Sequence, residues 1–389
     1  MYQKVNEKGS ALLITLCLMG MLTLVALTAV KNSNTDMELS FNSENSERAF
    51  YIAEAGAKRA VSEIYGSSTW RAGYNDIGFS GGTYTVQVID STSEPALDDT
   101  VIVSAVGELN NATAEVEIML TPVYEYPFSY ALFGDKGVSF DQTTCTDSYN
   151  SDSGSYATTV LSDYGSVGSN GTISTSKLVS IGGDAQTATP GGITLGAGTT
   201  VSGDTTTTAD SVKIDFVPDA EFAWAQTNST ASTGLSGFGY TYNSGTKSLV
   251  LNTNSQVTLS SGVYYFSSIS AGQYSQINLA AGAKVTVYVT GDIIFNQGST
   301  FNAGGAPKDA IIYSQGSKLQ FDQSNKFYGA FIGSNATVQY DQTTEVYGSI
   351  IASYVKLDKN ACLHYDRDLA SVRRIVKGET QIVAWREVF

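Results

Sequence analysis

An uncharged apolar run near the N-terminus constrains this chain more than any other feature. Residues 10–30 contain no Asp, Glu, Lys or Arg and are rich in Leu, Met, Ala and Val, and Lys31 ends the run. A helix rises about 1.5 Å per residue, so this run would span about 31 Å, which is the thickness of one bilayer core. The run therefore predicts a membrane-spanning helix.

The charges beside this run predict its orientation. Lys4 and Lys8 precede it, while Asp36 and Glu38 follow it closely. The positive-inside rule then places the N-terminus in the cytoplasm and the rest of the chain outside the inner membrane, as a single-pass protein. A cleaved signal peptide is the alternative, but its apolar region would be only about 7–15 residues long and would end at a small-x-small cleavage site.

The helical pattern continues beyond the membrane segment. Gly66 and two serines then mark a stop, so one helix is predicted over residues 10–66, with 10–30 in the membrane. Apolar residues recur at three- and four-residue spacing and form one stripe: Phe50, Ala53, Ala57, Val61 and Ile64.

Two blocks of this region carry a family resemblance. Lys8 and Gly9, followed by SALLITL from Ser10, resemble the leader and mature start of a type IV prepilin. The segment RAFYIAEAG over residues 48–56 is similar to the second block of PilX-type minor pilins. The resemblance implies a leader of residues 1–9, cleavage by a prepilin peptidase after Gly9, and methylation of the new N-terminus at Ser10. It also implies that the helix packs with those of other pilins on an inner-membrane assembly platform.

One position departs from the family pattern. Most pilins carry Glu at the fifth mature position, where it neutralises the N-terminal amine of a neighbouring subunit, but this chain has Ile14. A subunit with no neighbour beyond it meets no such amine, so Ile14 fits a tip or priming position. The alternative, that the Glu is simply dispensable here, stays open.

Three short segments after the helix alternate with period two, as half-buried strands do. They are residues 82–89, 100–106 and 114–120. An antiparallel sheet of these strands would cover the apolar stripe of the helix. Pro122 and Pro127 mark a boundary, so we predict a pilin sheet over 67–123 and a separate head over 124–389.

The head region contains internal repeats. The motifs LQFD, VQYD and VKLD end at Asp322, Asp341 and Asp358, at spacings of 19 and 17 residues. Short strands with polar turns at a period near 18 predict a parallel β-solenoid, with a β-sandwich as the alternative. The fold class expected is thus an α+β pilin N-terminus followed by a mainly-β domain.

The head also resembles an uncharacterised β-helical domain that follows PilX-type helices. The segments SGVYYF over residues 261–266 and LHYD over residues 363–366 suggest this most clearly. The function of that family is not established, so the resemblance implies a fold and a context only.

Two cysteines occupy the same place in the repeat. Cys145 and Cys362 each follow an aspartate of the repeat by four residues. If their coils are neighbours, the thiols would lie within disulfide reach, and the compartment outside the inner membrane is oxidising. Two free buried thiols are the alternative. Cys17 lies in the membrane segment and is interpreted as apolar filler.

Charge and composition exclude several functions. The formal net charge is −15, which argues against nucleic-acid binding because that needs clustered Lys and Arg. The chain has one histidine, His364, and three cysteines, too few for a multi-histidine metal site or a zinc cluster. We therefore expect no cofactor.

Four aspartates of the repeat would form a row on the solenoid: Asp141, Asp322, Asp341 and Asp358. Asp is favoured in turns, so a turn role is predicted. A calcium site at Asp322 and Asp341 and acid catalysis are the alternatives. His364 is interpreted as a structural residue, and we expect no enzyme activity.

These features together predict a minor pilin, anchored in the membrane before assembly and then placed at or near the tip of a type IV pilus on the cell surface. Its head would be a structural and interaction domain, with adhesion to a surface glycan or protein as a hypothesis. Two alternatives stay open: a tip pseudopilin of a type II secretion system, and a pilin-anchored β-helix that binds or degrades polysaccharide.

Overall fold

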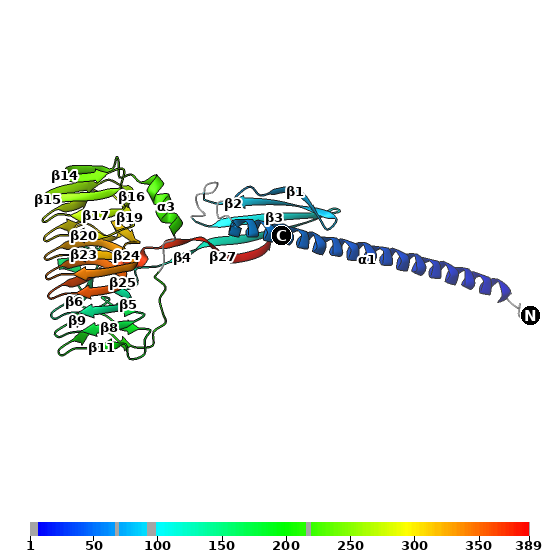
Figure 1. Ribbon diagram of the computed structural model, residues 1–389. Helices are drawn as coiled ribbons and strands as arrows, with labels where there is room; N and C mark the ends of the chain where they lie inside the picture. Colours follow the sequence, from blue (N-terminus) through cyan, green and yellow to red (C-terminus); the bar gives the residue numbers. More distant parts are fainter. Residues whose placement is uncertain (1–6, 67–69, 92–98, 215–218, 389) are drawn as a thin grey trace, which may run out of the picture. The chain divides into compact units, whose positions relative to one another are not determined.

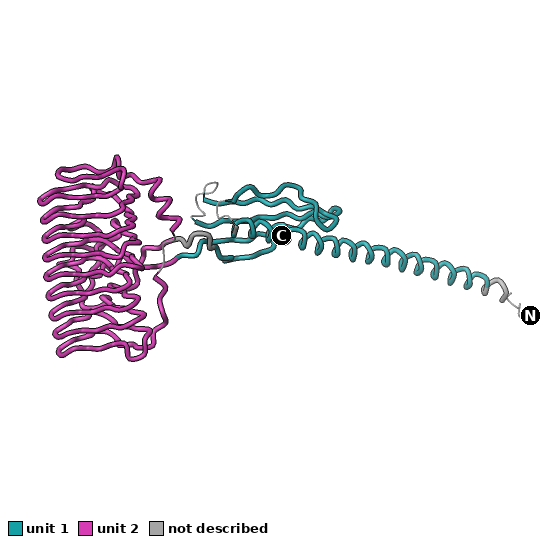
Figure 2. Tube along the Cα trace, in the orientation of Figure 1, with its two compact units in different colours: residues 1–124, 375–389 teal, residues 125–374 magenta. Residues whose placement is uncertain are grey.

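The computed structural model describes residues 7–66, 70–91, 99–214 and 219–388. The chain forms two units, shown in separate colours in Figure 2. Unit 1 comprises residues 1–124 and 375–389, and unit 2, called the head below, comprises residues 125–374. Residues 1–6 of the predicted leader and 67–69 at the start of the predicted sheet region lie outside the described residues.

Unit 1 begins with one long helix, α1 (Glu7–Gly66). Its 60 residues correspond to about 90 Å of helix. The helix ends at Gly66, as the sequence predicts. Only its C-terminal third is covered by other parts of unit 1, and its buried apolar residues there are Ala49, Ile52, Ala53, Ala57, Ala60, Val61 and Ile64.

This part of α1 packs on a five-stranded sheet with the order β1-β2-β3-β4-β27. Strands β1 to β4 are antiparallel neighbours. The three predicted strands correspond to β2, β3 and β4, whereas the sequence analysis missed β1 and β27. The bounds are β1 (Tyr74–Phe79), β2 (Gly82–Ile89), β3 (Val101–Leu109), β4 (Ala112–Glu125) and β27 (Arg374–Val388).

Two glycines allow the helix and the sheet to approach closely. A Cβ on Gly107 of β3 would lie 2.2 Å from the carbonyl oxygen of Ala49, and a Cβ on Gly56 would lie 2.7 Å from the ring of Tyr84. Both distances are shorter than any real contact, so larger side chains would push the sheet off the helix. Gly56 is the last residue of the PilX-like block, and this contact is its physical role here.

The predicted extent of the head, 124–389, is wrong at its C-terminal end. The head ends at Arg374, and residues 375–389 belong to unit 1. The reason is that β27 lies beside β4 in the unit 1 sheet, where Arg386 forms an ion pair with Glu117 and Trp385 packs edge-on against Phe50 at 5.7 Å.

The head is a parallel β-solenoid. A typical strand pairs in parallel with the strand three places later in the chain, as β16, β19 and β22 do, so each coil contributes to three faces. In the described part of the head the strands are interrupted by the short helices α2 (Tyr156–Thr159) and α3 (Asp219–Asn228) and by the 3-10 turns η2 (Pro307–Asp309) and η3 (Arg367–Ser371). The prediction of a pilin-type helix and sheet followed by a mainly-β solenoid is confirmed.

The strands of the head up to the middle of the chain are β5 (Leu132–Phe140), β6 (Cys145–Tyr149), β7 (Val167–Ser169), β8 (Thr172–Thr175), β9 (Ser180–Ile181), β10 (Ala185–Thr187), β11 (Ile193–Thr194), β12 (Thr200–Val201), β13 (Thr205–Thr206), β14 (Leu235–Asn243) and β15 (Ser248–Leu259). Those that follow are β16 (Gly262–Phe266), β17 (Ser268–Ala271), β18 (Gln276–Leu279), β19 (Val285–Val289), β20 (Ile293–Phe295), β21 (Thr300–Phe301), β22 (Ala310–Ser314), β23 (Lys318–Phe321), β24 (Lys326–Tyr340), β25 (Glu345–Leu357) and β26 (Cys362–Asp366).

The coils are not stacked in chain order. The first coil, β5 and β6, pairs with β7 to β9 on one side and with β25 and β26, the last coil, on the other. The chain therefore enters near the middle of the stack, builds one end, crosses to the other end at β14, and returns. Figure 1 shows this as the teal β5 and β6 lying next to the orange-red β25. We call the junction between the first and last coils the seam.

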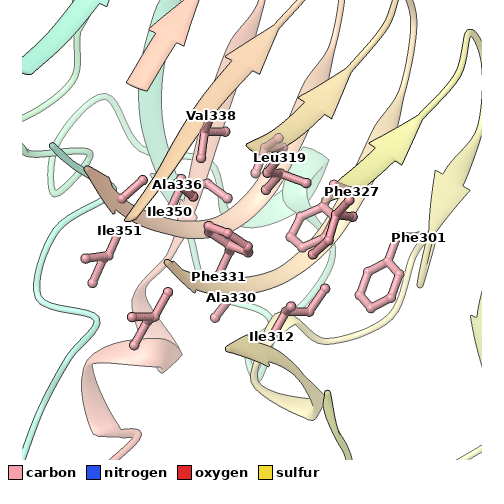
Figure 3. Packing of buried hydrophobic residues seen from close by; sticks show 14 of the residues in the cluster. Phe301, Ile312, Leu319, Phe327, Ala330, Phe331, Ala336, Val338, Ile350 and Ile351 are labelled. Carbon is pink, nitrogen blue, oxygen red and sulfur yellow. The ribbon is translucent and has the colours of Figure 1, made fainter. Parts of the chain in front are cut away.

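Rows of apolar side chains fill the interior of the solenoid (Figure 3). The rings of Phe295 and Phe321 stack at 5.3 Å, and those of Phe301 and Phe327 stack at 4.9 Å. These rows stay in register although the coils differ in length, because the extra residues of longer coils lie in loops outside the strands. Twenty-six residues separate paired positions in Phe301↔Phe327, but only 17 do so in Val346↔Leu363.

One corner of the solenoid has the same backbone in successive coils. Its third turn residue has a positive φ, for example 60° at Ser324 and 61° at Thr343. The N–H of that residue donates to a carbonyl of the next coil, from Ser324 to Gln342 at 3.1 Å and from Thr343 to Lys359 at 3.2 Å. The corner thus continues the hydrogen bonding between coils through the turn.

Candidate functional site

Residues 12–30 of α1 expose a continuous apolar surface, and the mostly polar stretch that follows them is exposed as well. All residues from 12 to 44 are exposed, among them Leu12 at 72% and Met19 at 71%. α1 contains a candidate membrane span with a mean hydropathy of 2.4 over its most apolar window, none of which is buried. A surface of this size on a stable protein faces lipid or other apolar helices.

Polar groups in this segment are satisfied within the helix. The hydroxyls of Thr23 and Thr28 donate to carbonyls one turn earlier, at 3.0 Å to Met19 and 2.6 Å to Leu24. Hydroxyls bonded in this way cost little in a medium without water. The segment is therefore suited to lipid in spite of its threonines.

The predicted processing residues lie at the start of this helix. α1 begins at Glu7, so Gly9 and Ser10 are in its first turn. Ile14 is 56% exposed and forms part of the apolar surface. Cleavage after Gly9 and methylation of Ser10 stay predictions.

The repeat aspartates form the row that the sequence predicts. The pairings Phe321↔Tyr340, Tyr340↔Leu357 and Leu357↔Phe140 place the following aspartates at one corner of four successive coils, in the order Asp322, Asp341, Asp358 and Asp141. Burial and the neighbouring carboxylates raise the pKa of Asp341 above its usual range. The row is therefore a line of like charges across the seam.

Three of these carboxylates are partnered by side chains two residues earlier, and the fourth, Asp141, accepts from the backbone N–H of Gln142 at 2.8 Å. Gln320 donates to Asp322 at 2.6 Å, Gln339 donates to Asp341 at 3.1 Å, and Lys356 pairs with Asp358 at 3.1 Å. Within the described residues no group of three or more His, Cys, Asp or Glu is placed to hold a metal ion. The structure therefore gives no set of ligands for a calcium ion at Asp322 and Asp341.

The two repeat cysteines meet at the seam. Cys145 and Cys362 are register partners in β6 and β26, and a disulfide joins them with 4.6 Å between their Cα atoms. Cys17 is free and exposed in the apolar part of α1. The bond therefore links the first coil in the chain to the last.

His364 lies on the outer side of the same two coils. Its Nδ1 lies 2.7 Å from Oδ1 of Asp147, whose other oxygen accepts from the hydroxyl of Tyr156 at 2.6 Å. The imidazole is 5% exposed and packs between the rings of Tyr156 and Tyr347, at 4.2 and 4.6 Å. This pairing and burial fit the structural role predicted for His364.

A column of rings runs along the solenoid from this histidine. Parallel register aligns Tyr328, Tyr347 and His364 in successive coils, and the rings of Tyr328 and Tyr347 stack at 4.1 Å with only 10° between their planes. The coil beyond Tyr328 places Asn302 next in the row, because Phe301 pairs with Phe327. Asn302 carries no ring, and its amide donates to the carbonyl of Tyr328 at 3.2 Å.

A cavity of about 480 Å³, called the cleft below, opens where this column stops. One wall consists of four tyrosines: Tyr149, Tyr156, Tyr328 and Tyr347. The rest of the lining consists of small residues from two segments that are far apart in the chain: Ser151, Gly154, Ser155 and Ala157 from one, and Gly304, Gly305 and Ala306 from the other. Cavities of this size, with aromatic walls, are typical of small-molecule sites.

Tyr149 has an unsatisfied hydroxyl in this wall. The residue is only 3% exposed, and its hydroxyl finds no hydrogen-bond partner in the part of the chain that the structure describes. Burial, helped by the charge of Asp366, raises the pKa of this phenol, so the hydroxyl stays protonated at neutral pH. A buried donor without an acceptor costs free energy that a ligand could recover.

The charges around the cleft are mostly negative. Asp147 and Glu345 accept from its tyrosines, and Asp366 accepts from Ser151 at 2.6 Å. Lys308 lies beside the cleft but is already paired with Asp152 at 2.6 Å and with Asp368. An anionic ligand would therefore meet repulsion at this site.

The cleft was not predicted from the sequence. Two signals were present: the Tyr-Gly pairs at Tyr328 and Tyr347 in equivalent repeats, and His364 in the next one. They mark one row on the solenoid. The loops that close the cleft, around residues 154 and 305, are far apart in the chain and have no motif of their own.

Comparisons with known proteins bear on both units. Residues 8–58 match the family described as PilX N-terminal, and residues 272–372 match a domain of unknown function, DUF7305. None of the curated proteins matches the chain in sequence. The N-terminal segment is thus similar to the PilX N-terminal family and is followed by a C-terminal β domain, which confirms the predicted resemblance.

Among solved structures, the competence-associated pilin ComZ from Thermus thermophilus is 12% identical, with 88% of this chain and 97% of that chain covered and a TM-score of 0.29. An ice-binding protein from Antarctomyces psychrotrophicus is 17% identical, covering 62% and 97%, with a TM-score of 0.31. An ice-binding protein from an Antarctic biological consortium is 15% identical, covering 63% and 91%, with a TM-score of 0.34. Likenesses at this level carry no argument about function.

Proposed function

We propose that this chain is a minor pilin of a type IV pilus or a pilus-like machine. The observation that carries the proposal is the division of α1 into two parts. Residues 12–30 expose a long apolar surface, whereas from Ala49 onward one face of the helix is buried against the unit 1 sheet. The PilX N-terminal match covers both the exposed part and the start of the buried part. A helix of this kind serves as a membrane anchor first and as a polymer contact afterwards.

The assembly step follows from the chemistry of this surface. In the inner membrane, with the N-terminus cytoplasmic, residues 12–30 lie in lipid; a prepilin peptidase removes residues 1–9, and Ser10 is methylated. Lipid and helix surfaces are equally apolar, so transfer into a filament gains from side-chain packing with other pilins rather than from leaving water. Ile14 adds no carboxylate to that contact, which fits a place at or near the tip.

In this proposal the head is a binding domain without catalytic activity. The repeat aspartates are paired with Gln and Lys side chains, and His364 is buried against Asp147. The head comprises residues 125–374, far more than a priming subunit needs. We propose that it presents a rigid acidic surface for adhesion at the cell surface.

Mass spectrometry of the native protein tests the processing step. We expect the mature chain to begin at methylated Ser10, and a Gly9→Val variant to retain residues 1–9 because the bulky side chain sits beside the cut bond. A mature chain that begins anywhere else would overturn the proposal.

Immunogold labelling of sheared filaments tests the location. Antibodies against the head should label filament ends. Label along the whole filament would refute the tip position while keeping the pilin role, and unlabelled filaments from cells that express the protein would refute both.

A further inference from the structure

We propose that the cleft beside the ring column binds a neutral sugar ring, stacked on Tyr328 and hydrogen-bonded to the hydroxyl of Tyr149. The inference deepens the adhesive role proposed for the head and rests on it for its biological meaning. All residues of the site belong to the head.

The ring column supplies the first part of the argument. Tyr347 has a ring on each side, His364 and Tyr328, whereas Tyr328 is followed in its row by Asn302. Tyr328 also lines the cleft together with Gly304 and Gly305. The protein supplies an amide and no ring on this side of Tyr328, and the cavity beside Tyr328 and the two glycines leaves space for a flat ligand ring.

The small residues of the wall supply the second part. A Cβ on Gly304 would meet no atom within 4 Å, so the space beside this residue is open. Gly305 and Ala306, which are also small, line the cleft beside Gly304. A ligand can therefore approach the Tyr328 ring and backbone groups at the same time.

The unpartnered Tyr149 hydroxyl selects the chemistry of the ligand. Tyr149 lines the cleft, and its hydroxyl is buried without an acceptor among the described residues, so a ligand group that reaches this O–H would supply the missing acceptor. Sugar hydroxyls both accept and donate, and the C–H face of a pyranose is apolar enough to lie on an aromatic ring. A simple cation, such as a quaternary ammonium group, would leave the Tyr149 donor unsatisfied.

Charge narrows the class further. Asp147 and Glu345 accept from tyrosines of the cleft, and Asp366 accepts from Ser151. Lys326 is already paired with Glu345 at 3.0 Å, and Lys308 is held by two other carboxylates. Sialylated or uronic-acid glycans would bring a further negative charge into this region. The site therefore fits neutral hexose oligosaccharides.

The position of the cleft suits adhesion, because two loops far apart in the sequence hold it in a fixed shape. Lys308, just after the 304–306 wall, pairs with Asp152 of the loop that precedes α2. The tyrosine wall stands on the paired strands β24, β25 and β6, next to the disulfide. A preformed site loses little conformational entropy on binding.

The test uses the full chain in detergent micelles on an array of neutral, sialylated and uronic-acid glycans, with tetramethylammonium as a competitor. We expect binding to neutral hexose oligosaccharides. Tyr328→Ala should weaken it about tenfold, and Tyr149→Phe, which keeps the ring and removes only the hydroxyl, about fivefold. Trp224→Ala is the matched control, because Trp224 is 47% exposed on α3 and does not line the cleft.

Several outcomes would overturn the inference. They are binding of anionic glycans only, competition by tetramethylammonium, an empty array, or neutral-glycan binding that Tyr149→Phe and Tyr328→Ala leave unchanged in folded protein. Thermal unfolding of each variant establishes folding. Filament labelling and the mature N-terminus test the pilin role, whereas the glycan array tests the sugar site. Failure of the sugar site can therefore be told apart from failure of the pilin proposal.

Discussion

The disulfide at the seam should stabilise the head strongly. Cys145 and Cys362 are 217 residues apart in the chain, so the bond closes a very long loop in the unfolded state. The chain-entropy relation gives about 5 kcal/mol for a loop of this length, and native disulfides measured by removal give about 2–5 kcal/mol. We expect the double variant Cys145→Ser/Cys362→Ser to lose about 3–5 kcal/mol.

Thermal unfolding of the purified protein measures this loss. For a domain of this size 1 kcal/mol corresponds to about 2–4 °C, so the head transition should fall by about 6–20 °C. Each single variant should lose nearly as much as the double variant, because either substitution removes the whole bond. Reducing the native protein should give the same shift.

Cys17→Ser is the matched control, because Cys17 is free and lies in α1 outside the head. It should leave the head transition unchanged. The reasoning would be refuted if the double variant unfolded within about 2 °C of the oxidised native protein, or if the losses of the two single variants simply added.

Three further predictions concern other parts of the chain. Gly107→Val should destabilise unit 1 by about 3 kcal/mol, because the new side chain would clash with the Ala49 carbonyl. Faster proteolysis of α1 would measure this loss. Gly20→Ala is the control and should have no effect, because no atom lies within 4 Å of the added Cβ. A chain that ends at Arg374 should keep a protease-resistant head while its unit 1 loses resistance, whereas unfolding of both would contradict the assignment of β27. The pKa of Asp341 is higher in the folded head than in the unfolded chain, where it is near 4, so the folded head binds the proton more tightly. The free energy of unfolding of the head should therefore rise as the pH falls from the folded pKa to the unfolded pKa. Asp341→Asn should stabilise the head by about 0.5 kcal/mol at pH 7 and reduce the dependence of its melting temperature on pH between 4 and 7. A variant whose head melts at a lower temperature than the native head at pH 7 would contradict the prediction.

The sequence predicted the long helix and the solenoid because both follow from local patterns. An uncharged run such as residues 10–30 has few alternatives, and the repeats that end at Asp322, Asp341 and Asp358 pair with their nearest neighbours in the chain. In these regions contacts in space follow the order of the sequence.

The order of the coils could not be predicted in the same way. The segment around Asp141 shares the motif of the one around Asp341, which indicates the same corner but not which coils are adjacent. The equal offsets of Cys145 and Cys362 were the one sign that the first and last coils meet. That contact depends on the whole stack closing, which no local pattern encodes.

The end of the head was missed for a related reason. A period-two pattern tells which face of a strand is buried but not which sheet it joins. Residues 374–388 contain Ile, Val and Trp, as strands often do, yet they extend the unit 1 sheet beside β4 and not the solenoid. The cleft could not be predicted because loops without a sequence motif supply much of its lining.

The insertion of the head between two adjacent strands has a mechanical consequence. The chain leaves the unit 1 sheet at the end of β4 and re-enters it at the start of β27, its neighbour. A pull on the head is then shared by two backbones anchored side by side, rather than borne by a single flexible linker. If a bound surface is drawn in by filament retraction, this double tether spreads the tension over the sheet, and the disulfide keeps the stack from unwinding at the coils where both tethers begin.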